Sequence, residues 1–193
     1  RSLAGRGAAV SPTTIYGWLA HAIVFGALVS LLPLGAKRRY VGMAAVPLAL
    51  VAGIATLLHG FAGTPSATLL ALAIWQLAGR GASPLGQRPA WLVVGFAMVF
   101  YPLALGLGPF DPYAVGYQPW PLLLACGALA ATLWSHRRND WLLILAVALA
   151  GYAGGLFANL WDALVDPLLA LAALAIVIEQ LTRQKSAGDT TAG

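Results

Sequence analysis

The chain has 193 residues, of which 60% are hydrophobic and only 9% are charged, and its formal net charge is +5. A soluble domain carries about a quarter charged residues, so water cannot be the main solvent of this surface, and the lipid bilayer is the natural alternative. The basic residues form short clusters between apolar runs, which is typical of membrane orientation, and we expect no nucleic-acid partner. The single Cys126 can form neither an intramolecular disulfide nor a thiolate metal cluster.

In chain order, seven apolar runs predict an all-α fold, a polytopic bundle of about seven short transmembrane helices. The runs cover residues 14–34, 41–61, 65–78, 90–107, 121–134, 141–159 and 167–181. Three of them are shorter than the ~20 residues that a hydrocarbon core requires, so each must lie upright, thin the bilayer or fail to span it. A polar residue before a proline, as in Thr64-Pro65 and Asp166-Pro167, predicts the beginning of a helix.

The loops between the runs predict the orientation in the membrane. If all seven runs cross, one side holds nine of the eleven basic residues: Lys37, Arg38, Arg39, Arg80, Arg88, Arg137, Arg138, Arg183 and Lys185. Only Arg1 and Arg6 fall on the other side, so the positive-inside rule places the N-terminus outside and the C-terminus in the cytoplasm. We expect one transmembrane helical domain over residues 1–185 and a disordered polar tail over 186–193. Short cytoplasmic loops without a targeting sequence favour a multi-pass protein of a bacterial inner membrane.

Acidic and aromatic residues gather in two loops on the side opposite the basic clusters. The first loop holds Asp111, Tyr113, Tyr117 and Trp120, and the second holds Asn159, Trp161, Asp162 and Asp166. One interpretation is an extracytoplasmic pocket for a lipid or lipid-linked ligand, in which the aromatic residues and Asn159 bind the ligand. The three carboxylates and His59 are then the candidate catalytic residues, because such groups act as general bases. The alternative is structural: Asp166 caps a helix, the other acids close turns, and the aromatic residues anchor the interface.

The histidines of the outer half, His21 and His59, suggest a different site, in which two imidazoles hold a haem iron between neighbouring helices. Their depths should differ, however, because His21 lies inside a run and His59 near the end of one, and two axial ligands need matching depth. We therefore expect ordinary hydrogen-bonded histidines, and neither a cofactor nor a metal.

Charge is nearly absent from the apolar runs, in which Glu179 is the single Asp, Glu, Lys or Arg. Ion-coupled transporters bury such groups near the midplane, so we do not expect one here. Gly-x-Ser-x-Gly, His-Glu-x-x-His and Walker patterns are also absent from the sequence.

Three hypotheses remain, and the sequence does not decide whether the protein is an enzyme. The first is a non-catalytic membrane subunit or envelope-associated protein that docks partner proteins or lipids. The second is an enzyme acting on a lipid or lipid-linked substrate at the extracytoplasmic interface. The third is an uncoupled channel or facilitator for a small solute.

Overall fold

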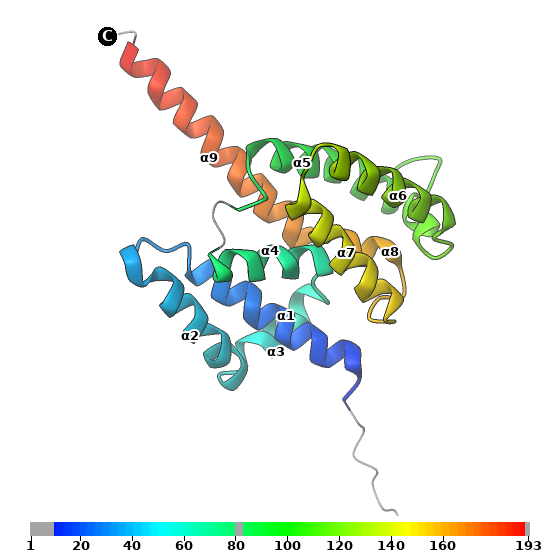
Figure 1. The fold of residues 1–193 in the computed structure, drawn as a ribbon, viewed down its shortest axis with the longest axis horizontal. Helices are drawn as coiled ribbons and strands as arrows, with labels where there is room; N and C mark the ends of the chain where they lie inside the picture. The colour runs from blue at the N-terminus through cyan, green and yellow to red at the C-terminus, as the bar shows by residue number, and fades with distance from the viewer. Residues whose placement is uncertain (1–9, 80–82, 192–193) are drawn as a thin grey trace, which may run out of the picture.

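The computed structural model describes residues 10–79 and 83–191, which form helices and turns without a strand (Figure 1). The α-helices are α1 (Pro12–Val29), α2 (Arg38–Val51), α3 (Ile54–Ala62), α4 (Ala67–Ala78), α5 (Gln87–Ala104), α6 (Trp120–Ser135), α7 (Asn139–Ala153), α8 (Leu160–Leu164) and α9 (Pro167–Thr191). Two 3-10 helices, η1 (Gly35–Lys37) and η2 (Tyr113–Gly116), precede α2 and α6. Each of the seven predicted runs overlaps at least one helix, so the all-α prediction is confirmed. Some predictions fall outside the described residues. These are the side of the membrane predicted for Arg1, Arg6 and Arg80, and the part of the predicted disordered tail at residues 192–193.

The prediction of about seven transmembrane helices is met only in part. Two described helices are long and apolar enough to cross a membrane, α1 and the segment Pro167–Gln184 of α9, and the bent pair of α2 and α3 adds a third if it is one span. Helix α5 has 18 residues but begins with the polar Gln87 and Arg88 and is not apolar enough, whereas the other helices fail on length. Helices α4, α6 and α7 have 12, 16 and 15 residues. At 1.5 Å per residue they measure about 18–24 Å, against a hydrocarbon core of ~30 Å.

Two of the predicted runs are not single helices. The run 41–61 divides into α2 and α3, whose axes differ by 78°, and Gly53 at the break has a φ of 73°. A residue in this left-handed region ends a right-handed helix, and glycine adopts it without a steric penalty. The run 141–159 leaves the helical conformation after Ala153, and Gly155 in the following turn has a φ of 74°. Helix α9, by contrast, continues to Thr191, past residue 186 where we expected the polar tail to begin.

The ends of the long helices lie at two opposite ends of the bundle. We call one of them the basic end, because it carries Arg38 and Arg39 at the start of α2 and Arg88 at the start of α5. At the basic end, the Arg39 guanidinium donates to the carbonyl of Ala78, and the indole N–H of Trp91 donates to the side-chain oxygen of Gln180 at 3.1 Å. At the opposite end, the Tyr16 hydroxyl donates to the carbonyl of Pro65 at 3.1 Å, which joins the starts of α1 and α4. We call this the loop end, because it carries the connections formed by residues 105–119 and 154–166.

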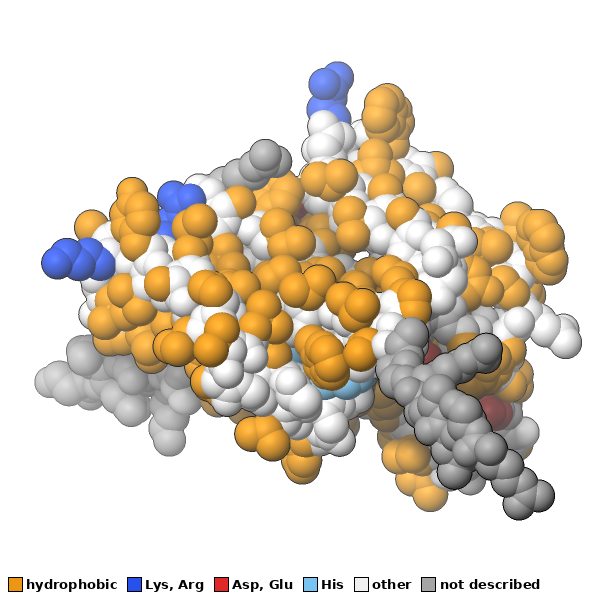
Figure 2. Space-filling model, turned by 90° about the horizontal axis from the view of Figure 1, so that it is seen from below, with side chains coloured by type: hydrophobic (Ala, Val, Ile, Leu, Met, Phe, Trp, Pro, Cys, Tyr) orange, Lys and Arg blue, Asp and Glu red, His pale blue; other side chains and the backbone are white. Residues whose placement is uncertain are grey.

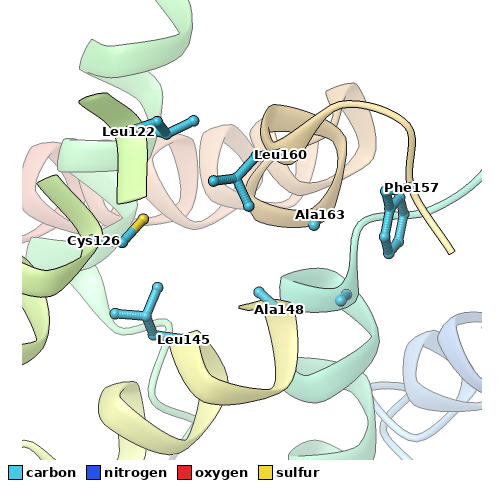
Figure 3. Packing of buried hydrophobic residues seen from close by; sticks show 8 residues of the cluster. Leu122, Cys126, Leu145, Ala148, Phe157, Leu160 and Ala163 are labelled. Atoms are coloured by element: carbon cyan, nitrogen blue, oxygen red, sulfur yellow. The ribbon is translucent and has the colours of Figure 1, made fainter. Parts of the chain in front are cut away.

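Two kinds of packing hold the helices of the bundle together. A buried cluster fixes the connection 154–166 against α6 and α7 (Figure 3), and it contains Ala67, Leu122, Cys126, Leu145, Ala148, Phe157, Leu160 and Ala163. Elsewhere α1 and α2 meet backbone to backbone: a Cβ built on Gly26 would lie 2.7 Å from the carbonyl oxygen of Gly42, and one built on Gly42 would lie 2.7 Å from that of Gly26. Small residues permit this close approach of two helices.

Candidate functional site

The two predicted site loops lie against each other at the loop end. The indole N–H of Trp161 donates to the carbonyl of Pro112 at 2.9 Å, and the Asn159 amide donates to the carbonyl of Tyr113 at 3.0 Å. Asn159 is fully buried, and its Oδ1 accepts from the backbone N–H of Trp161 at 2.9 Å, which starts α8. A Cβ built on Gly116 would lie 1.7 Å from Oδ1 of Asn159, so only glycine fits there. Sequence reasoning identified Asn159 and missed Gly116.

Tyr113 and Asp162 form a direct side-chain pair across these loops. The Tyr113 hydroxyl lies 3.0 and 3.1 Å from the two carboxylate oxygens of Asp162, so the phenol donates and the carboxylate accepts. Burial raises the pKa of Asp162, and the hydrogen bond from Tyr113 opposes this rise. Burial also raises the pKa of Tyr113, and the hydrogen bond that it donates to the Asp162 carboxylate raises this pKa further. The proton between the two groups therefore stays on the tyrosine at neutral pH.

Asp166 joins two helices and uses both carboxylate oxygens to do so. Oδ1 accepts from the backbone N–H of Leu169 at 2.7 Å, which caps the first turn of α9, and Oδ2 accepts from the backbone N–H of Ser66, just before α4. Its side chain is 7% exposed. Ser66 in turn caps α4, because its hydroxyl accepts from the N–H of Leu69 at 3.1 Å. Among the candidate catalytic carboxylates, Asp166 is thus the one that connects the start of α9 to the start of α4.

The remaining candidates in the first loop divide between those beside the pair and those away from it. Tyr117 packs edge-on against Tyr113, with ring centroids 5.7 Å apart. Asp111 is exposed, and its carboxylate accepts from the backbone N–H of Tyr113 at 2.9 Å, so it closes the turn before η2. Trp120 is 77% exposed at the start of α6. Of these three residues, the structure therefore places the side chain of Tyr117 against the ring of Tyr113, whereas Asp111 contacts the pair through the backbone of Tyr113.

The two histidines meet at one backbone carbonyl. The Nε2 of His21 lies 2.8 Å and the Nδ1 of His59 lies 3.0 Å from the oxygen of Gly63. A carbonyl oxygen only accepts, so each of these nitrogens carries a proton. The ring centroids are 6.0 Å apart, and a Cβ built on Gly17 would lie 2.4 Å from the His59 ring. Hydrogen bonds to the Gly63 carbonyl therefore hold both rings.

A cavity opens beside the Tyr113–Asp162 pair. Its volume of about 720 Å³ lies within the range of volumes found for small-molecule sites. Asp162, Asp166, Tyr113 and Trp161 contribute to its wall, as predicted site residues, and no lining residue that the structure describes is Lys, Arg or His. Most of the remaining wall is apolar and comes from α5 and from the connection after α7. Among residues 10–79 and 83–191, no group of three or more His, Cys, Asp or Glu could hold a metal ion.

Aromatic residues of α5 complete the wall, and sequence reasoning missed them. Phe100 packs on the indole of Trp161 with centroids 4.8 Å apart and on Phe96 with centroids 5.0 Å apart. The hydroxyl of Tyr101 is buried and has no hydrogen-bond partner among residues 10–79 and 83–191. The sequence feature that could have identified Tyr101 is its hydroxyl, the single one in the apolar run 90–107, directly before Pro102.

Comparison with known proteins adds no functional assignment. No protein-family model matches the chain, and neither the curated proteins nor the solved structures include a match to it. The function has to be argued from the cavity and its surroundings.

Proposed function

We propose that this chain is a multi-pass membrane protein of the bacterial inner membrane that binds a lipid or lipid-linked ligand, without catalysis, in the cavity at its loop end. This is the lipid-docking form of the first hypothesis. The cavity carries the proposal, because it has the size of a ligand site and combines apolar and aromatic walls with a few fixed polar groups.

The membrane setting is supported by the sizes of the buried and exposed side chains. Of the 26 buried hydrophobic residues among those described, 13 are alanine. Large apolar side chains face outward instead: Leu92, Met98 and Leu124 are 74%, 72% and 75% exposed. Hydrophobic side chains also cover most of the face seen in Figure 2, where Lys and Arg appear at its left and upper margins. Small residues between helices and large ones outside suit lipid as the solvent.

The proposed topology has about seven short crossings within one domain, with the loop end outside and the basic end in the cytoplasm. The short helices α4, α6 and α7 would be accommodated by local thinning of the bilayer. Cysteine labelling in whole cells tests this arrangement. In a Cys126→Ala background, a membrane-impermeant maleimide should label Ala114→Cys in η2 and spare Ala36→Cys in η1. Labelling of both positions, or of Ala36→Cys alone, would refute the topology.

The non-catalytic part of the proposal is supported by the partners of the acidic residues. Asp166 is held by two backbone N–H groups, Asp111 by one, and Asp162 by the Tyr113 hydroxyl. Groups held in this way position loops and line a site. The hydroxyl that Asp162 holds, that of Tyr113, keeps its proton because burial and the hydrogen bond to Asp162 raise its pKa.

Lipid analysis of the purified protein tests the proposed binding. The protein is extracted in a mild detergent, and its lipids are compared by mass spectrometry with those of the whole membrane. One lipid class should be enriched. Ala104→Phe, which places a ring in the cavity from α5, should abolish the enrichment, whereas Ala131→Phe on the exposed face of α6 should retain it. Equal lipid profiles for wild type and Ala104→Phe would contradict the proposal.

An enzyme acting on a lipid is the second candidate, and one observation favours it. Asp162 lies in the cavity wall with a raised pKa, which is a property of general bases. If this candidate is correct, the wild-type protein in vesicles converts the enriched lipid, and Asp162→Asn still binds the lipid without converting it. Unchanged lipid after prolonged incubation with wild type would exclude it.

A further inference from the structure

A second cavity lies next to the first and has a different character. It is an apolar groove of about 360 Å³, lined on one side by Leu92 and Phe96 of α5 and on the other by Ala125 and Leu129 of α6. Leu92 is 74% and Leu129 is 49% exposed, so the rim of the groove reaches the outer surface of the bundle. Thr68 is the one lining side chain with a hydroxyl among those described.

The groove and the cavity at the loop end meet at two residues. Trp161 and Val165 line both spaces. Trp161 is held in place by its hydrogen bond to Pro112 and by the tilted packing of its indole against Phe100. One ligand can therefore have a polar part in the cavity and an apolar part in the groove, on the two sides of this boundary. That division is the one found in a membrane lipid.

The charge of the cavity selects among lipid headgroups. Its described wall contains the carboxylates of Asp162 and Asp166, the faces of several aromatic rings and no basic side chain. Aromatic faces and carboxylates attract a cation, while a headgroup with only negative charge would be repelled without compensation. An ammonium group fits this wall.

Resting on the proposed function, we infer that the ligand is a lipid with an ammonium headgroup, bound with the headgroup in the cavity beside Tyr113 and Asp162 and one acyl chain in the groove between α5 and α6. The carboxylate of Asp162, the ring of Trp161 and the groove side of α6 each recognise a different part of the same molecule.

Native mass spectrometry with lipids of matched dioleoyl chains tests the headgroup. Phosphatidylethanolamine should bind about fivefold or more tightly than phosphatidylglycerol. Its N-acetyl derivative, which keeps the phosphoethanolamine skeleton, gains one acetyl group and loses the positive charge, should bind as weakly as phosphatidylglycerol. Soluble phosphoethanolamine should not compete, because it has no chain for the groove; competition would show that a free amine is the ligand and would overturn the inference. Asp162→Asn should remove the preference, and the N-acetyl comparison holds even if that variant does not fold.

A matched pair on α6 tests the chain. Ala125→Phe fills the groove and should weaken binding of both lipids about tenfold, by loss of an apolar contact. Ala128→Phe lies on the same helix outside the groove and should bind as wild type does. Equal binding of the three headgroups, or an effect of Ala128→Phe equal to that of Ala125→Phe, would overturn this inference and leave lipid binding itself intact. Failure of every lipid to bind the wild type more tightly than Ala104→Phe would instead overturn the proposed function.

Discussion

Replacement of Asp166 by alanine should destabilise the protein much more than replacement of the other loop acids. In the structure its carboxylate accepts from the N–H of Leu169 and the N–H of Ser66, and the side chain is buried. Loss of a helix cap costs about 1 kcal/mol. A second buried N–H left without a partner costs about 1–3 kcal/mol. The expected total is about 2–4 kcal/mol.

For a chain of this size, that loss corresponds to a fall in melting temperature of roughly 5–15 °C. The assay is thermal unfolding of the purified protein in a mild detergent, followed by circular dichroism at 222 nm and by aggregation. Asp111→Ala is the matched control, because its exposed carboxylate holds a single turn N–H and its loss should cost at most about 1 kcal/mol.

Asp166→Asn separates the two roles of this carboxylate. Asparagine caps helices well, so the bond to Leu169 is retained, but its amide cannot accept from both backbone groups. Its melting temperature should lie between those of wild type and Asp166→Ala. Equal stability of Asp166→Ala and Asp111→Ala would refute this account of the joint between α4 and α9.

Three further outcomes follow from named contacts. Gly26→Ala should cost about 1–3 kcal/mol in unfolding free energy, because the added methyl group meets the carbonyl of Gly42. Gly95→Ala is the control, because a methyl group there meets open space and should be neutral or stabilising. Equal effects of the two substitutions would contradict the close packing of α1 on α2. Asp162→Asn should gain stability relative to wild type as pH rises from 4 to 7. The folded-state pKa of Asp162 is raised above its ordinary 3.8, so the stabilising contribution of this carboxyl group is complete at low pH and is lost as pH rises through the folded-state pKa. A difference in melting temperature between the two proteins that does not change with pH would refute this expectation. Tyr113→Phe should cost about 1–2 kcal/mol through the lost hydrogen bond to Asp162, whereas Tyr40→Phe at an exposed hydroxyl should not change the melting curve.

Local signals in the sequence predicted the positions of the helices better than their lengths. Asp166-Pro167 begins α9 as predicted, because a capping carboxylate and a proline in the first turn act within a few residues. At Thr64-Pro65 the helix starts two residues later, since Ser66 supplies the cap. The bend at Gly53 was not predictable in the same way, because a glycine within an apolar run is compatible with a continuous helix and with a left-handed break.

The candidate site shows the same division between local and long-range information. The loop composition identified Tyr113, Asn159, Trp161 and Asp162, which the structure brings together. It could not identify Phe100, whose place on Trp161 depends on how α5 packs against α8, or the sharing of the Gly63 carbonyl by two histidines from different helices. Contacts between distant segments follow from tertiary packing, which a single sequence does not encode in any short pattern.

The positions of two contacts along the chain bear on the order in which this protein can assemble during synthesis. Gly26 and Gly42 lie in consecutive helices, so the hairpin of α1 and α2 can pack as soon as both have left the ribosome. The contact between Ser66 and Asp166 joins residues 100 positions apart and has to wait for α9. The loop end, with the cavity in its wall, is therefore completed last, and a nascent chain arrested before residue 166 would carry α1 to α8 but lack Asp166 and Pro167 of the cavity wall.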